Sequence, residues 1–243
     1  MDHDHAGHRE RLRARFQQDR KEGFCDHELL ELLLTYAIPR RDTNALAHKL
    51  MNRFGSLSGV LEADMSELTQ VEGIGESAAT LILMLLPLFK RYQQERFTQR
   101  TPLNNMALLG AYCRTLFYGV HAEQFYVLSL DARLCLIHAD LIASGTPNQV
   151  RVSPREVASV LLRRNAVGAV LVHNHPAGSE LPSAADVETT AQIAATLSAL
   201  GIALYDHVLV AGHEAVSFKQ HRLMTGFTGM NDGAVACEQP RRG

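Results

Sequence analysis

Two histidines and an aspartate form the pattern in this sequence that is best suited to chemistry. His173 and His175 stand two residues apart, and Asp186 follows them after a turn-rich segment. Two imidazole nitrogens and one carboxylate oxygen are ligands that zinc accepts, and three protein ligands leave the fourth tetrahedral position open. An open position is typical of a catalytic zinc site rather than a structural one. The pattern therefore predicts a Zn²⁺ centre held by these three residues.

A strand and a helix start would have to position these ligands. Residues 166–172 have the apolar sequence AVGAVLV, which is typical of a buried strand. Side chains alternate along a strand, so the two histidines that follow should face the same way. Pro176 and Gly178 should then turn the chain. Ser183 is a candidate helix N-cap that places Asp186 in the first helical turn, from where it can meet both imidazoles.

The same residues also have a simpler structural explanation. Residues 183–186 form a plain capping pattern, in which an acid near the helix N-terminus is stabilised by the helix dipole. An isolated His-x-His pair is common by chance. The order of strand, paired histidines, turn, cap and acid favours the metal site, because this order directs all three ligands to one point.

Composition and charge set the frame for this site. The chain has 243 residues, of which 46% are hydrophobic and 21% charged, as in a globular protein of one large or two small domains. A net charge of -2 provides no global attraction for nucleic acid, so any such contact must be local. The four cysteines form no Cys-x-x-Cys pair and indicate reduced thiols. The N-terminus has no apolar signal core, and residues 81–88, the most apolar run, are too short to span a bilayer; we expect a cytoplasmic protein.

Residues 1–95 are predicted to form an all-helical domain. Apolar residues at helical spacing predict helices over residues 9–16, 26–34, 45–54, 65–70 and 78–92. Pro87 should kink or break the last of these helices. The polar stretch 93–105 is the expected linker to the next domain.

Two features of this helical part suit nucleic acid. The hairpin Gly73-Ile74-Gly75 lies between two predicted helices, where its bare backbone amides could bind phosphate; it is similar to a helix-hairpin-helix motif. Glu72 and Glu76 would repel phosphate, so a glycine turn used only for packing is the alternative. The second feature is a basic cluster, for which a solvated helix face is the alternative because acids are interleaved. Its members are Arg9, Arg11, Arg13, Arg15, Arg20 and Lys21.

The pattern changes to mixed strands and helices over residues 105–225, which indicates one α/β domain. Residues 125–130 and 134–137 read as a β-hairpin around residues 131–133. Helices are expected from Ser153 to Asn165 and from Ala184 to Leu200, and further strands over residues 202–205, 208–210 and 215–218. Residues 226–243 lack periodicity and are expected to be a disordered tail.

These residues resemble known families. His173-x-His175-Pro176-x-Gly178 followed by Pro182-Ser183-x-x-Asp186 is similar to the JAMM metal signature of MPN-domain hydrolases. With residues 153–157, Asn165-Ala166 and the glycine hairpin, the chain resembles the bacterial RadC family from Arg9 to about Phe218. The resemblance implies a two-domain α+β chain: an all-α helix-hairpin-helix domain, then an α/β MPN/JAMM domain of cytidine-deaminase-like type with a mixed sheet. It also implies a zinc hydrolase that attacks amide or isopeptide bonds. The family carries a name linked to DNA repair, but that name does not establish an activity.

The family pattern adds two candidate catalytic residues. It contains a serine, which matches Ser183, and an upstream glutamate, which matches best at Glu123 and less well at Asp140. Glu123 would act as general base toward the zinc-activated water, and the Ser183 hydroxyl would stabilise the oxyanion. A solvated acid at a strand end is the alternative for Glu123. Asp206-His207 would orient a ligand or form a buried hydrogen-bonded pair.

Two other functions stay open at this point. One is an accessory protein that binds DNA through the glycine hairpin and the N-terminal arginines and uses the MPN-like domain only as a scaffold. The other is a zinc nuclease, because three ligands and an open position also suit a phosphate electrophile. A nucleobase deaminase is disfavoured, since its zinc site needs a Cys-x-x-Cys pair.

Overall fold

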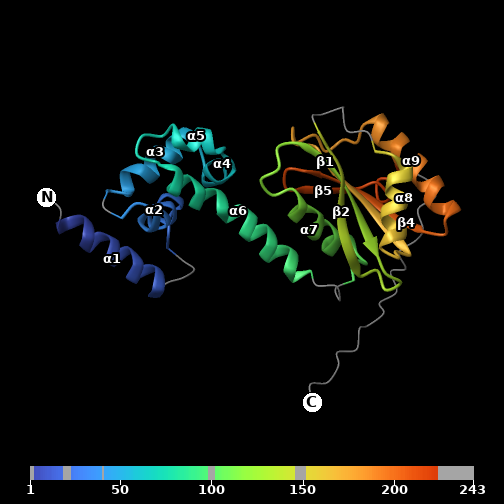
Figure 1. Cartoon of the computed structure of the whole chain (residues 1–243), viewed down its shortest axis with the longest axis horizontal. Helices are drawn as coiled ribbons and strands as arrows, with labels where there is room; N and C mark the ends of the chain where they lie inside the picture. Colours follow the sequence, from blue (N-terminus) through green and yellow to red (C-terminus); the bar gives the residue numbers. More distant parts are fainter. Residues whose placement is uncertain (1–2, 19–22, 40, 98–101, 146–151, 224–243) are drawn as a thin grey trace, which may run out of the picture. The chain divides into compact units, whose positions relative to one another are not determined.

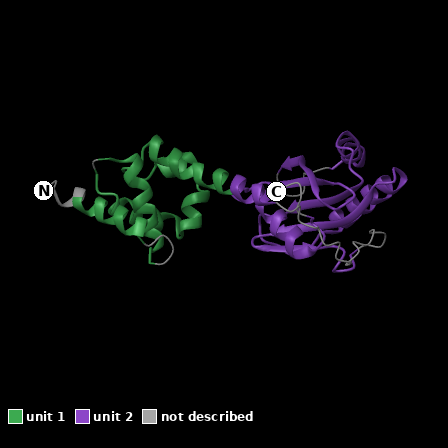
Figure 2. Ribbon diagram, turned by 90° about the horizontal axis from the view of Figure 1, so that it is seen from below, with its two compact units in different colours: residues 1–89 green, residues 90–243 purple. Residues whose placement is uncertain are grey.

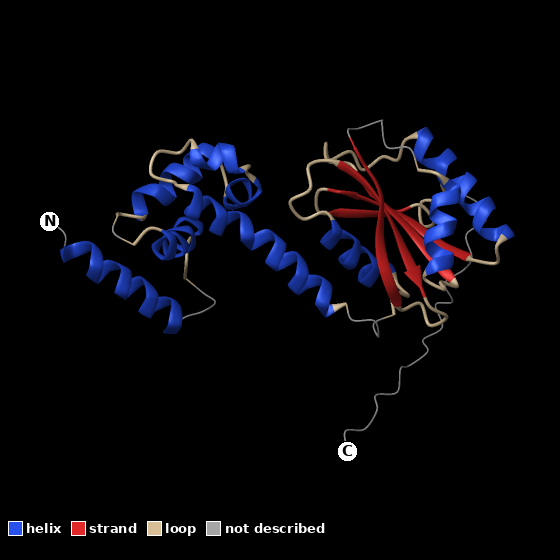
Figure 3. Cartoon of the chain, viewed as in Figure 1, coloured by secondary structure: helices blue, strands red, loops and turns tan. Residues whose placement is uncertain are grey.

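The structure divides into two compact units. The computed structural model describes residues 3–18, 23–39, 41–97, 102–145 and 152–223. The units comprise residues 1–89 and 90–243 (Figure 2). The first is helical and the second combines helices with a sheet, which confirms the predicted two-domain α+β class (Figure 3). The predicted tail lies outside the described residues. No helix in the described part of the chain has both the length and the apolar character that crossing a membrane requires.

The first unit is built from six helices within the described residues (Figure 1). They are α1 (His3–Gln18), α2 (Asp26–Ala37), α3 (Asn44–Phe54), α4 (Leu57–Glu62), α5 (Met65–Thr69) and the start of α6 (Glu76–Arg96). The sequence analysis missed α4, which begins where the Ser56 side chain accepts the Gly59 N–H at 3.0 Å. The leucine stripes form the core, in which Leu34, Leu50 and Leu68 have no exposed surface.

Two local predictions for this unit, at Pro87 and at the glycine turn, have different outcomes. Helix α6 does not break at Pro87. The proline removes only one helical hydrogen bond, and the strong helix formers around it allow the helix to continue. The predicted turn lies between α5 and α6, where Gly73 has a φ of 99°. A Cβ at this position would also lie 2.6 Å from the Leu46 Cδ2 atom. Gly73 is therefore required for the turn and for packing, which agrees with the alternative that needs no ligand.

The second unit contains one mixed sheet. Its strands are β1 (Glu123–Leu130), β2 (Leu136–Gly145), β3 (Gly168–Asn174), β4 (Ala203–Ala211) and β5 (Glu214–Ser217). They lie in the order β2-β1-β3-β4-β5. Within this order β3 and β4 are parallel, and the other neighbours are antiparallel. The predicted hairpin joins β1 to β2, and the mixed sheet is confirmed.

Helices cover both faces of the sheet. Helix α7 (Met106–Leu116) packs on β4 and β5, and its core includes side chains from the middle of β3 and β4. Helices α8 (Pro154–Arg163) and α9 (Ala184–Ala199) cover the opposite face (Figure 1). Strand β3 is central and buried along its whole length. The side chains at the end of β3 therefore meet the start of β1 and the start of α9.

Candidate metal centre

The end of β3 presents both histidines on one face. The strand runs two residues further than the sequence predicted and includes His173. Its start shifts too, because a turn after α8 uses Ala166, whose N–H donates to the Leu161 carbonyl at 3.0 Å. The His175 N–H donates to the Val210 carbonyl at 2.9 Å, so pairing with β4 continues past the end of β3. The two imidazoles thus lie side by side, with ring centroids 5.0 Å apart.

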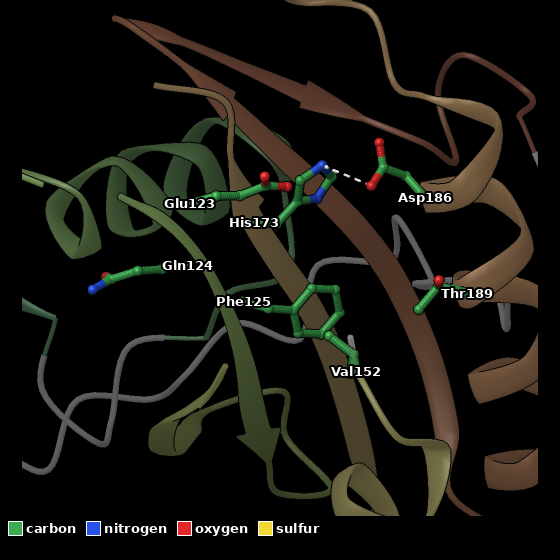
Figure 4. Close-up of a pocket in the computed structure, with 7 residues that line it drawn as sticks. All are labelled: Glu123, Gln124, Phe125, Val152, His173, Asp186 and Thr189. Carbon is green, nitrogen blue, oxygen red and sulfur yellow. Dashed lines mark ion pairs between the residues drawn. The ribbon is translucent and has the colours of Figure 1, made fainter. Parts of the chain in front are cut away.

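Asp186 meets both imidazoles from the first turn of α9. Its Oδ1 lies 3.6 Å from the His173 Nε2, and its Oδ2 lies 3.6 Å from the His175 Nε2. Figure 4 shows the carboxylate turned toward His173. Ligand atoms about 2.0 Å from a tetrahedral zinc lie about 3.3 Å apart. One potential ligand atom from each of the three residues lies within 4.8 Å of the other two, so the residues are close enough to converge on one ion. We call His173, His175 and Asp186 the candidate metal centre; among the described residues it is the one such cluster of potential ligands.

A capping box holds Asp186 in place. The Ser183 Oγ accepts the Asp186 N–H at 3.2 Å, while the Asp186 Oδ2 accepts the Ser183 N–H and O–H, each at 2.7 Å. Burial would raise the pKa of the Asp186 carboxyl, but His173 and the bonds from Ser183 hold that pKa well below its usual range. The carboxylate is therefore ionised. The capping pattern and the predicted metal pattern are thus formed by the same residues.

His173 has an unsatisfied nitrogen that points into this centre. Its side chain is 2% exposed, and its Nε2 is buried without a hydrogen-bond partner among the described residues. Leaving a buried polar atom unpaired costs about 1–3 kcal/mol, so native structures rarely do so without a reason. A metal ion bound at this nitrogen would remove the cost. The residues present therefore fit a zinc ion by this test as well as by their spacing.

Hydrogen bonds fix the tautomer of His175. Its Nδ1 lies 2.9 Å from the Ser179 carbonyl oxygen. A carbonyl can only accept, so Nδ1 carries a proton, and in the neutral imidazole Nε2 is the acceptor that faces Asp186.

A chain of buried groups fixes the tautomer of His173 in the same way. The Thr190 hydroxyl donates to the backbone carbonyl of Asp186, so it must accept the proton on the His207 Nδ1, which is 2.7 Å away. Burial and the nearby His173 lower the pKa of His207 well below its usual value, so His207 is neutral and its Nε2 is an acceptor. The His173 Nδ1, 2.8 Å from that atom, is then the donor. We call this chain the histidine relay; in the neutral His173 imidazole it leaves Nε2 as the unprotonated nitrogen, the atom that a metal would bind.

Glu123 lies at the pocket beside this centre. It is the first residue of β1, and it lines a pocket with Phe125, Val152, His173, Asp186 and neighbouring side chains. In Figure 4 its carboxylate is directed toward the His173 imidazole, from the side opposite Asp186. The structure thus brings the predicted base to the predicted ligands.

The alternative base is elsewhere. Asp140 lies within β2, an edge strand, and pairs with Val127 rather than with the start of β1. Arg164 donates to its carboxylate at 2.6 and 3.1 Å, and His138 lies 3.1 Å from it. Burial would raise the pKa of Asp140, but these partners lower it below the usual value. The geometry therefore favours Glu123 as the base.

The predicted pair Asp206-His207 divides between the two faces of the sheet. His207 belongs to the histidine relay, as expected of a residue that orients a ligand. Asp206 instead accepts the Ser217 hydroxyl at 2.5 Å and the His207 N–H at 2.8 Å. It does not contact the metal centre and helps to hold β4 and β5 together.

Comparisons with known proteins identify the family of this chain. Family models match a RadC-like JAB domain at residues 103–223 and a UPF0758 N-terminal domain at residues 4–80. A UPF0758 protein of Ruegeria pomeroyi is 39% identical over 212 residues, which cover 87% of this chain and 95% of the relative. A UPF0758 protein of Rhodobacter capsulatus is 39% identical over 213 residues, which cover 88% and 100%. The chain belongs to the RadC family. Its second unit is thus a RadC-like JAB domain, a relative of the JAMM-type proteins.

In this RadC-family chain, most of the described N-terminal arginines already have partners within their unit. Arg9 donates to two backbone carbonyls, and Arg13 lies 3.4 Å from a threonine hydroxyl of α2. Arg15 forms a 2.6 Å ion pair with a glutamate of α2. Arg20 and Lys21 lie outside the described residues. These contacts hold the arginines to their own unit, and phosphate contact by the cluster stays a prediction.

Sequence reasoning missed two residues that the structure places around the site. Thr190 stands four residues after Asp186 in α9, hence on the same helix face, and this spacing was an available signal. Asn174 stands between the two histidines and was assigned no role. Its side chain reaches the start of β1, where Glu123 lies.

Proposed function

We propose that this chain is a zinc-dependent hydrolase of the JAMM type, in which activated water attacks an amide or isopeptide bond. The observation that carries the proposal is the buried Nε2 of His173, which has no hydrogen-bond partner among the described residues and faces the ionised Asp186 at 3.6 Å. A histidine used only for packing would have both nitrogens paired. The family resemblance supplies the bond class, and the site supplies the chemistry.

The proposed division of work follows from the geometry. His173, His175 and Asp186 would hold zinc, which would lower the pKa of a bound water from about 15.7 toward about 7 and polarise the carbonyl of the substrate. Glu123 would accept the proton of the attacking water and pass it to the leaving amine. Ser183 was predicted to stabilise the oxyanion, but its hydroxyl proton is directed to Asp186. The geometry therefore favours Ser183 as the residue that orients the carboxylate ligand.

The pocket lining favours a carbonyl substrate over a phosphodiester. The described side chains that line the pocket include two carboxylates and neither lysine nor arginine. Phosphate recognition commonly uses arginine or lysine to neutralise the phosphoryl oxygens. A neutral amide needs no such partner. This contrast supports the hydrolase of amide bonds over the zinc nuclease.

The decisive experiment compares two substitutions. Glu123→Gln should keep zinc but lose about 10²- to 10⁴-fold in hydrolysis, because it removes the base and none of the ligands. His173→Ala should lose zinc itself. Zinc content would be measured on purified protein, and hydrolysis on peptide, isopeptide and nucleic-acid substrates. Unchanged hydrolysis in Glu123→Gln, or cleavage of nucleic acid alone, would overturn the proposal.

DNA binding by the first unit is a second candidate function, and it rests on the glycine hairpin. A Cβ at Gly75 would meet nothing within 4 Å, so the backbone of the turn is open at that point. Glu72 stands beside it with its carboxylate bound to Lys49 at 3.0 Å. Gly75→Asp should weaken duplex binding and its salt dependence, while Gly75→Ala should not. Duplex binding as tight as that of the wild type in both variants would exclude the hairpin as the contact.

A further inference from the structure

Asn174 makes a pair of hydrogen bonds across the sheet. The residue lies between the two histidine ligands and is 4% exposed. Its Oδ1 accepts the backbone N–H of Gln124 at 2.7 Å, and its Nδ2 donates to the backbone carbonyl of Ala122 at 3.0 Å. These two backbone groups flank Glu123. One side chain of β3 therefore holds the peptide groups on both sides of the candidate base.

The backbone pairing of the two strands ends just before this point. The last pair between β1 and β3 is Phe125 with His173, while Glu123 pairs with Gly145 of β2. The start of β1 thus has a ladder on its β2 side only. A carboxamide offers one acceptor and an N–H donor, as a peptide group does, so the Asn174 side chain replaces the missing ladder on the β3 side.

We propose that Asn174 is a positioning residue for the general base, an inference that rests on the proposed function of Glu123. It ties the backbone of residues 122–124 to the strand that carries the histidine ligands. The two hydrogen bonds thereby fix the position of the start of β1, which carries the base, relative to the end of β3, which carries the histidine ligands. A general base works only within hydrogen-bond reach of the proton it removes, and a displacement of about 1 Å can cost about 10²-fold in rate. The structure also explains why an amide side chain stands between the two histidines.

Two substitutions separate this role from simple packing. Asn174→Asp keeps the acceptor for the Gln124 N–H but sets an oxygen against the Ala122 carbonyl, and Asn174→Ala removes both bonds. Each should lower kcat by about 10- to 100-fold with KM and zinc affinity unchanged. Asn165→Asp makes the same chemical change at an exposed position outside the site and should behave as wild type.

A double substitution and amide exchange complete the test. In the Glu123→Gln background, Asn174→Asp should cost no further activity, because the base it positions is absent. Hydrogen exchange at the Gln124 amide should be faster in Asn174→Ala than in wild type. Additive losses of activity, loss of zinc, or unchanged exchange would each overturn the inference. If the wild type hydrolyses no amide, the proposed function fails, and the exchange result then decides on its own whether Asn174 clamps β1.

Discussion

The histidine relay makes its sharpest prediction at Thr190. Thr190→Val keeps the shape of the side chain and removes its hydroxyl. The His207 Nδ1–H then loses its acceptor in a fully buried position. Either this proton stays unpaired, or His207 moves it to Nε2. The second outcome forces His173 to carry its own proton on Nε2, which is the atom that should bind the metal.

The expected magnitude is similar by two routes. An unpaired buried donor costs about 1–3 kcal/mol. Replacing an outer partner of a metal-binding histidine typically costs about 10- to 100-fold in affinity. That range corresponds to about 1.4–2.7 kcal/mol. Zinc affinity of Thr190→Val should therefore fall by about 10- to 100-fold, while Thr190→Ser, which keeps the hydroxyl, should stay near wild type.

The assay is a chelator competition for zinc at one fixed pH. Thr196→Val is the matched control, because the Thr196 hydroxyl also donates to the carbonyl four residues earlier in α9 but contacts no histidine. Long-range proton–nitrogen NMR of the metal-free protein reads the tautomers directly. Equal affinity for zinc in Thr190→Val and Thr190→Ser, or a proton on the His173 Nε2 in the wild type, would refute the reasoning.

Three further predictions concern stability and the ligand carboxylate. Gly73→Ala should destabilise the first unit by about 1–3 kcal/mol in chemical unfolding, since its φ of 99° strains any other residue, while Gly75→Ala should be neutral. Asp140→Asn should lower the melting temperature at neutral pH, because the pKa of Asp140 is lower in the folded protein than in the unfolded chain. The contribution of this carboxylate to folding stability is fully present above its unfolded pKa of about 3.9. It is lost as pH falls through the folded pKa. The difference between Asp140→Asn and wild type should therefore shrink in acid, and a gap that widens there would contradict the role of Arg164. Ser183→Ala should weaken zinc binding in the same chelator competition more than it slows turnover at saturating zinc, and the reverse order would restore the oxyanion role.

Local patterns in the sequence were enough to predict the candidate ligands. Alternation along a strand placed His173 and His175 on one face, and the capping pattern placed Asp186 in the first turn of α9. Both are short-range rules that hold whatever the rest of the fold does. The same rules gave the β1–β2 hairpin and the glycine turn, since each depends on neighbouring residues only.

The partners of these ligands could not be predicted in the same way. His207 meets His173 because β4 lies beside β3 in parallel, and periodicity does not reveal which strands are neighbours. Asn174 acts on β1, which lies 50 residues earlier in the chain at Gln124. The possible break of α6 at Pro87 did not occur, because the local rule for proline does not account for the strong helix formers on both sides.

The end point of the histidine relay has a consequence for metal exchange. The Thr190 hydroxyl bonds to the main-chain carbonyl of Asp186, the residue whose carboxylate would coordinate the ion. Fraying of the first turn of α9 would thus withdraw the Asp186 carboxylate and, in the same event, free the Thr190 hydroxyl, so that the tautomer of His173 would no longer be fixed. Zinc binding and the winding of the first turn of α9 would then be one linked equilibrium, and opening of that turn would favour release of the ion.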